Sequence, residues 1–180
     1  PRVPAAVRLV VGVLALWLAW LAVVQARMVG INFLLSVLAL VWAADISAYF
    51  AGRAFGLRFT KNKLAPAISP GKSWEGVWGG AVGVLLLALV WVAIDAGGYT
   101  SVPSFYTVLA RQGWWLLLLA ALFMTAMSVA GDLIESLIKR SAGVKDSSHL
   151  LPGHGGVLDR VDALLPTLPL ALMLYSLVSP

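Results

Sequence analysis

Long uninterrupted apolar blocks are the feature that most constrains what this chain can fold into. Of its 180 residues, 61% are hydrophobic and only 12% are charged, whereas soluble domains carry about 25% charged residues. The polar residues are too few to cover a globule in water. The blocks also lack the short alternating runs that are typical of a transmembrane barrel. The sequence therefore predicts several membrane-spanning helices.

Five of these blocks come near the ~20 residues that a helix needs to cross the hydrocarbon core of a bilayer. We expect spanning helices over residues 7–26, 31–52, 73–96, 113–138 and 158–178. The predicted fold is an all-α integral membrane protein, a bundle of about five transmembrane helices. Residues 1–180 are expected to form a single transmembrane domain.

Lysine and arginine predict how the bundle is oriented. If five helices alternate in direction, 11 of the 13 basic residues fall on one side, mostly in the two long loops after the second and fourth helices. The positive-inside rule places these two basic loops, with Lys63 and Ser148, in the cytoplasm, and Ser104 on the opposite side. The net charge of +5 suits anionic lipid or nucleotide phosphate as a partner, and we expect no nucleic acid.

Four glycines begin the third predicted helix at small-xxx-small spacing: Gly76, Gly79, Gly80 and Gly83. Such glycines let another helix approach closely, so we interpret them as a tight helix contact without a chemical role. The chain has no cysteine and two histidines. This composition excludes disulfides and thiolate metal sites, and it leaves too few histidines for a histidine-based zinc centre without help from carboxylates.

Acidic residues inside the apolar blocks are the first functional candidates, because ionisable groups are costly at that depth. Asp45 and Asp132 both lie roughly 10–12 Å from the expected inner interface, at 1.5 Å per residue. They are therefore placed to line one water-filled cavity. Helical spacing puts Tyr49 on the face of Asp45. It also puts Ser128, Glu135, Ser136 and Lys139 on the face of Asp132. For Glu135, a structural pair with Lys139 remains an alternative.

A third cluster lies in residues 145–162. Gly155 and Gly156 permit a close backbone approach to an anion. Asp159 and Asp162 follow at i, i+3 spacing, next to Arg160. Either aspartate taken alone is also explained as a favourable charge at a helix N-terminus.

Four segments of the chain resemble one known family. They are DISAYFAGRAFG (45–56), SPGKSWEG (69–76), GDLIES (131–136) and SLIKRSAGVKDSSHLLPGHGGVLDRVD (136–162). Together and in this order they resemble the phosphatidate cytidylyltransferases, also called CDP-diacylglycerol synthases. That family is usually longer, and we expect its additional N-terminal helices to be absent from this chain.

The resemblance implies transfer of the cytidylyl group of CTP to phosphatidate in phospholipid biosynthesis. It further implies a magnesium ion, with potassium beside it, and a homodimer among membrane lipids. We expect the bacterial inner (plasma) membrane, with the active site facing the cytoplasm. Asp132, Asp159 and Asp162 would be metal-site carboxylates, with Lys139 also catalytic. Residues implied to bind substrate are Ser69, Lys72, Ser136, Arg140, Lys145, Asp146, His154, Gly155 and Gly156; further candidates are Asp45, Tyr49, Glu75 and Glu135.

The residues also support phosphate chemistry by themselves. Nucleotidyl transfer brings two anionic phosphates together, and cations stabilise the resulting charge. Aspartate oxygens suit magnesium as ligands. The competing interpretations are another lipid-linked phosphotransferase or lipid kinase, an ion-coupled transporter, and a non-catalytic membrane assembly subunit. A transporter would use broken helices near the bilayer midplane. Here the polar groups gather at one membrane face and in the two basic loops, which favours phosphate chemistry.

Overall fold

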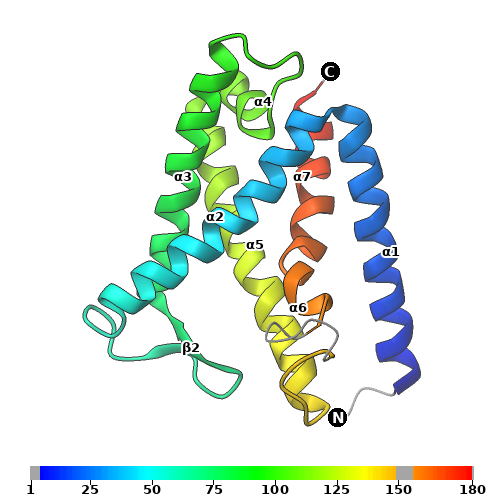
Figure 1. The fold of residues 1–180 in the computed structure, drawn as a ribbon, viewed down its shortest axis with the longest axis vertical. Helices are drawn as coiled ribbons and strands as arrows, with labels where there is room; N and C mark the ends of the chain where they lie inside the picture. Colours follow the sequence, from blue (N-terminus) through cyan, green and yellow to red (C-terminus); the bar gives the residue numbers. More distant parts are fainter. Residues whose placement is uncertain (1–4, 149–155, 180) are drawn as a thin grey trace.

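The computed structural model describes residues 5–148 and 156–179, and within them the chain is mostly helical (Figure 1). The elements in chain order are α1 (Ala5–Val29), α2 (Ile31–Phe55), β1 (Lys63–Ala65), β2 (Ser69–Ser73), α3 (Trp74–Ala96), α4 (Phe105–Gln112), α5 (Trp114–Ser141), α6 (Leu158–Val161) and α7 (Leu164–Val178). The predicted all-α fold is confirmed, with one small addition, because β1 and β2 form an antiparallel pair within the first basic loop.

Among the described residues, four helices are long and apolar enough to cross a membrane: residues 9–29 of α1, and α2, α3 and α5. The protein is therefore a multi-pass membrane protein. The fifth predicted span, 158–178, is broken, because Asp162 and Ala163 separate α6 from α7. The remaining helix α7 is apolar but has only 15 residues, or about 22 Å of helix. It is therefore shorter than the ~20-residue span that the sequence predicted.

The glycines of α3 bring that helix directly onto α2, as predicted. A Cβ atom added at Gly79 would overlap the Cβ of Ala51, and one added at Gly80 would lie 3.0 Å from the carbonyl oxygen of Ala44. Gly131 makes a similar approach between α5 and α7, where its added Cβ would lie 2.8 Å from Cγ of Pro166. These glycines, which have no side chain, thus allow the close spacing of the helices that surround the polar residues.

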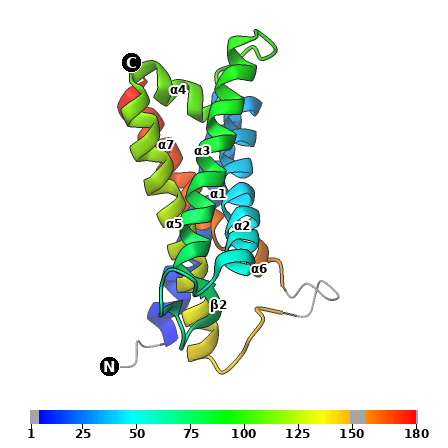
Figure 2. The same cartoon turned by 90° about the vertical axis from the view of Figure 1, so that its left-hand side faces the viewer.

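The two basic loops meet at one end of the bundle, which we call the hairpin end. Figures 1 and 2 show β2, α6 and the start of α1 at this end, and α4 at the opposite end. In the hairpin, Lys63 lies opposite Ser73, and Ala65 lies opposite Ser69. Ser73 then caps α3, because its hydroxyl accepts a hydrogen bond from the amide of Gly76 (3.2 Å).

A buried glutamate attaches the loop before the hairpin to the start of α3. One oxygen of Glu75 accepts hydrogen bonds from the amides of Phe59 (3.1 Å) and Thr60 (2.8 Å) and from the Thr60 hydroxyl (2.8 Å). Glu75 is 7% exposed. These bonds and the Ser73 cap hold both sides of the hairpin to α3, and so they determine where Lys72 of β2 lies.

The opposite end is held by a second polar network, centred on Asp95. Its carboxylate accepts hydrogen bonds from Asn32 (2.9 Å), Thr100 (2.8 Å), Thr107 (2.5 Å) and the amide of Ser104 (2.8 Å). The network joins α2, the loop after α3, and α4. We assign it a structural role, because its carboxylate oxygens are occupied by donors from the protein itself.

Candidate active site

A cavity of about 370 Å³ lies at the hairpin end, between α2, α3, β2 and α5. Small residues form much of its wall, where the glycine contacts bring α2 and α3 together. Its polar lining consists of Asp45, Tyr49, Arg53, Lys72, Ser73, Thr125 and Asp132. The sequence placed Asp45 and Asp132 at one depth, and the structure confirms that both line this single cavity.

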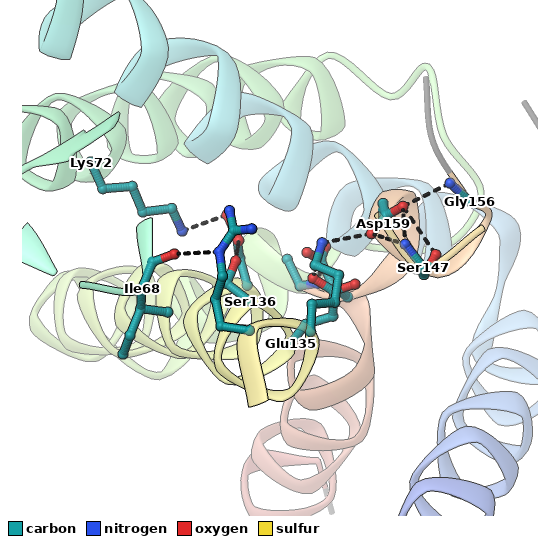
Figure 3. A network of polar contacts seen from close by, with 12 residues as sticks. Ile68, Lys72, Glu135, Ser136, Ser147, Gly156 and Asp159 are labelled. Atoms are coloured by element: carbon teal, nitrogen blue, oxygen red, sulfur yellow. Dashed lines mark hydrogen bonds and ion pairs between the residues drawn. The ribbon is translucent and has the colours of Figure 1, made fainter. Parts of the chain in front are cut away.

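Lys72 and Asp132 form an ion pair across the cavity. Their side chains are 25% and 32% exposed, so water reaches the pair only in part. The Ser136 hydroxyl also donates to Asp132, at 3.3 Å, from one helical turn further along α5 (Figure 3). The pair joins two of the segments that carry the resemblance, although Lys72 and Asp132 are far apart in sequence.

A second cluster surrounds Lys139, near the end of α5. Its ammonium group lies 2.5 Å from Glu135 and 2.6 Å from Asp159. Asp159 also accepts hydrogen bonds from the amide of Ser147 (3.0 Å), from its hydroxyl (3.0 Å) and from the amide of Gly156 (2.7 Å) (Figure 3). The Glu135–Lys139 ion pair, which was the alternative interpretation of Glu135, is therefore present. Asp159 connects α5 to Ser147 and Gly156, on the two sides of the second basic loop.

The electrostatics of the two loop aspartates differ. Burial acts to raise the pKa of Asp159, but the hydrogen bonds from Lys139, Gly156 and Ser147 outweigh burial and hold that pKa well below its usual value. The pKa of Asp162 is raised to about 6. Burial is the main cause of this increase, and repulsion from Asp132 and Asp45 raises the pKa further. The hydrogen bond from the Ala163 amide and the attraction of Lys139 lower it in part. The charges of Asp132 and Asp45 therefore act on Asp162 in addition to its burial.

Arg140 connects the two basic loops, because its Nε donates to the carbonyl oxygen of Ile68 at the hairpin turn (3.5 Å). Lys145 and Asp146 follow α5 and are exposed, and Ser69 begins β2 on the neighbouring loop. Gly156 is buried beside Asp159. His154 and Gly155 lie outside the described residues.

The expected metal ligands do not form one compact cluster. The described parts of the chain, 5–148 and 156–179, contain no group of three or more His, Asp or Glu residues placed to hold a metal ion. Asp159 is bound by Lys139, whereas Asp132 lines the cavity together with Asp45. Magnesium in proteins is usually held by one or two carboxylates together with phosphate oxygens and water. A hard divalent cation at Asp132 would fit this donor chemistry, with phosphate oxygens and water as its other ligands, and the Lys72 ammonium stands in for such a charge.

The structure adds residues that the sequence interpretation missed. Arg53 lines the cavity and donates to the hydroxyl of Tyr49 (3.2 Å), but from sequence it counted only toward orientation. Its position, one helical turn after Tyr49 and two after Asp45, was the available signal. Ser147 binds Asp159 through both its amide and its hydroxyl, and no local sequence pattern predicts that contact.

Comparisons with known proteins agree on one family. The sequence model of the family described as "Cytidylyltransferase family" matches residues 2–178. Phosphatidate cytidylyltransferase of Haemophilus influenzae is 47% identical over 149 residues, which are 83% of this chain and 47% of that protein. The enzymes of that name from Pseudomonas aeruginosa and Bacillus subtilis are 44% and 38% identical, over 90% and 83% of this chain and 55% and 49% of their own lengths. The chain thus spans about half the length of the curated relatives it matches.

Proposed function

The chain belongs to the cytidylyltransferase family, and from this membership we propose that it transfers the cytidylyl group of CTP to phosphatidate. The products are CDP-diacylglycerol, a phospholipid precursor, and pyrophosphate. The relatives that support the proposal carry the name phosphatidate cytidylyltransferase and match most of this chain. The structural observation that carries it is the Lys72–Asp132 ion pair, inside a cavity between membrane-spanning helices at the end where two basic loops meet.

The cavity is suited to the lipid phosphate. Arg53 and Lys72 supply two cations, while Ala48, Val77 and Val129 supply apolar wall. A phosphate that is anchored in the bilayer can reach such a position from between the helices. We propose that the soluble nucleotide binds next to it, against Arg140, Lys145 and the backbone of Ser147 and Gly156, which Asp159 holds in place.

We propose a direct in-line displacement. A phosphate oxygen of phosphatidate attacks the α-phosphorus of CTP, the new oxygen–phosphorus bond forms, and the bond from that phosphorus to the β-phosphate oxygen breaks, so that pyrophosphate leaves. The lipid phosphate is already an anionic nucleophile at neutral pH, so no base is needed to create it. The protein contributes mainly position and neutralising charge, as in other phosphoryl transfers.

We further propose that magnesium is held by Asp132 and Asp162, together with phosphate oxygens of the substrates. When bound, it would supply Lewis-acid neutralisation of phosphate charge. Asp159 as a third ligand, and potassium beside magnesium, stay predictions. So do a homodimer, the bacterial inner membrane, and the cytoplasmic orientation that the positive-inside rule favours.

Labelled CTP tests the proposal and separates it from a lipid kinase. Purified protein in mixed micelles with phosphatidate should transfer radioactivity to the lipid from α-³²P-CTP but not from γ-³²P-CTP. The Asp132→Asn variant is the matched control for background. Transfer of the γ-label would indicate a kinase. If neither label is transferred, the proposed function is wrong.

A further inference from the structure

Lys72 occupies a position at Asp132 that a metal cation would also take. Its Nζ contacts Oδ2 of Asp132, and about two thirds or more of each side chain is buried. Lysine carries a compact charge at the end of a flexible four-carbon stem. Its ammonium can therefore leave Asp132 by side-chain rotation, without any movement of α3 or α5.

The surroundings of Asp132 favour a charge greater than the single charge of one ammonium group. Asp45 lines the same cavity, so two carboxylates border the space that Lys72 enters. The nearest hydroxyl contact, from Ser136, is neutral. The other ammonium of the site, on Lys139, is shared between Glu135 and Asp159. Arg53 also lines the cavity, but its guanidinium donates to the Tyr49 hydroxyl, and within the described residues it forms no ion pair. Asp45 likewise forms no ion pair within these residues, so the cavity holds a carboxylate that Lys72 does not pair with.

The segment that carries Lys72 is held in place independently of the ion pair. Glu75 binds the loop before the hairpin, Ser73 caps α3, and Arg140 contacts the carbonyl of Ile68 at the turn. Loss of the bond to Asp132 therefore leaves Lys72 at the cavity. There its free ammonium would meet a substrate phosphate.

We infer that Lys72 and a divalent cation compete for Asp132, so that binding of the cation releases the Lys72 ammonium to bind substrate phosphate. The inference rests on the proposed function for the identity of the cation and of the phosphate. It assigns Lys72 two successive partners. A lysine that only bound phosphate would not influence cation affinity in this way when no substrate is present.

Cation binding without substrate tests the inference. Mn²⁺ serves as the probe, titrated into detergent-solubilised protein without CTP or phosphatidate and followed by electron paramagnetic resonance, with Mg²⁺ as competitor. Removing the competing charge in Lys72→Gln should tighten Mn²⁺ binding roughly twofold to fivefold, the range expected for a partly exposed ion pair. Lys72→Arg keeps the charge and should bind like the parent. Asp132→Asn should bind far more weakly.

Lys61 provides the matched control, because it is exposed just before the hairpin and forms no ion pair within the described residues. Lys61→Gln should leave Mn²⁺ affinity unchanged. Far-UV circular dichroism and gel filtration check that each variant is folded. Equal or weaker Mn²⁺ binding by folded Lys72→Gln overturns the inference, and so does the absence of Asp132-dependent binding in the parent.

The parent protein allows a second test that needs no folded variant. Acetylation of lysines by a soluble activated ester, measured by mass spectrometry, should become faster at Lys72 when Mg²⁺ is added and stay constant at Lys61. An unchanged rate at Lys72 under saturating Mg²⁺ also overturns the inference. Neither test contains CTP or lipid, so failure here is distinct from failure of the labelled-CTP assay.

Discussion

Asp132 and Asp159 are both aspartates of the resembling segments, yet their contacts differ. Asp132 has the Lys72 ion pair and one long hydrogen bond from Ser136. Asp159 accepts from Lys139, from Ser147 and from Gly156, and so holds the second basic loop to α5. The two residues should therefore fail in different ways when each is replaced by asparagine.

Asp132→Asn should lower kcat/KM about 100-fold or more, because the site loses a charge that helps to stabilise the transition state. Thermal stability should change little, because the one ion pair of Asp132 is partly exposed. Asp159→Asn should also lose turnover. It should additionally lower the free energy of unfolding by about 1–3 kcal/mol, since several donors lose a charged acceptor. Labelled-CTP assays and thermal unfolding in detergent measure both effects. Near-normal turnover of either variant at limiting Mg²⁺ would show that its carboxylate is not needed for the reaction.

Arg140 and Arg58 form a matched pair of basic loop residues. Arg140 contacts the hairpin through one 3.5 Å bond, and Arg58 lies 5.9 Å from the ring centre of Phe55. Neither contact is strong, so a difference in activity between the two variants would indicate that one of the arginines binds substrate. Arg140→Ala should reduce kcat/KM at least tenfold more than Arg58→Ala, the effect of roughly one lost charged hydrogen bond to phosphate. Equal, small effects would mean that Arg140 serves only orientation.

At the scale of elements, the sequence predicted the long helices well, because hydrophobic length is a local property. The helix starting at Ile31 was predicted to its first residue, and the glycines of α3 were correctly interpreted as a contact face. The hairpin was missed because residues 63–73 lack alternating apolar residues and depend on Glu75 and Ser73 for support. The break before α7 was missed because Asp162 and Ala163 do not themselves break helices, although Pro166 cannot donate a helical hydrogen bond to the carbonyl of Asp162.

Prediction of the site had the same limit. The shared cavity of Asp45 and Asp132 followed from counting residues along two helices, which is a local argument. The partners Lys72–Asp132 and Arg140–Ile68 join segments separated by about 60–70 residues, and only tertiary packing decides such pairs. Sequence could therefore select the reactive residues but could not say which of them are in contact.

The α2–α3 contact is open to a direct test. Gly79→Ala should lower the free energy of unfolding by about 1–3 kcal/mol, because the new Cβ overlaps the Cβ of Ala51. Gly12→Ala in α1 is the control, since no atom lies within 4 Å of its added Cβ. That change should be neutral or slightly stabilising. Similar stabilities of the two variants in detergent would contradict the close packing of α2 on α3.

At the scale of the whole molecule, the polar residues gather at two opposite ends. The hairpin end carries the cavity and both basic loops, and the α4 end carries the Asp95 network (Figures 1 and 2). This arrangement matches the predicted alternation of the long helices. It separates the site that we assign to chemistry from the network that holds the opposite loops together.

Cysteine labelling tests this arrangement in a membrane, and the cysteine-free chain makes single substitutions clean. Lys63 is exposed at the hairpin end, while Ser101 is exposed near α4. Ser104, the position first predicted to lie outside, is fully buried and therefore unsuitable. In inside-out vesicles, a membrane-impermeant maleimide should label Lys63→Cys but not Ser101→Cys. Labelling of both from the same side would contradict the orientation.

The stereochemical course at phosphorus is the most direct test of whether the cytidylyl group passes from CTP to phosphatidate in a single displacement. The protein would be given phosphatidate and one diastereomer of CTP with sulfur at the α-phosphorus, and the configuration of the CDP-diacylglycerol product would be determined. Attack by the lipid phosphate in a single displacement predicts net inversion. Net retention would require two displacements through a cytidylyl-protein intermediate, and it would contradict the account.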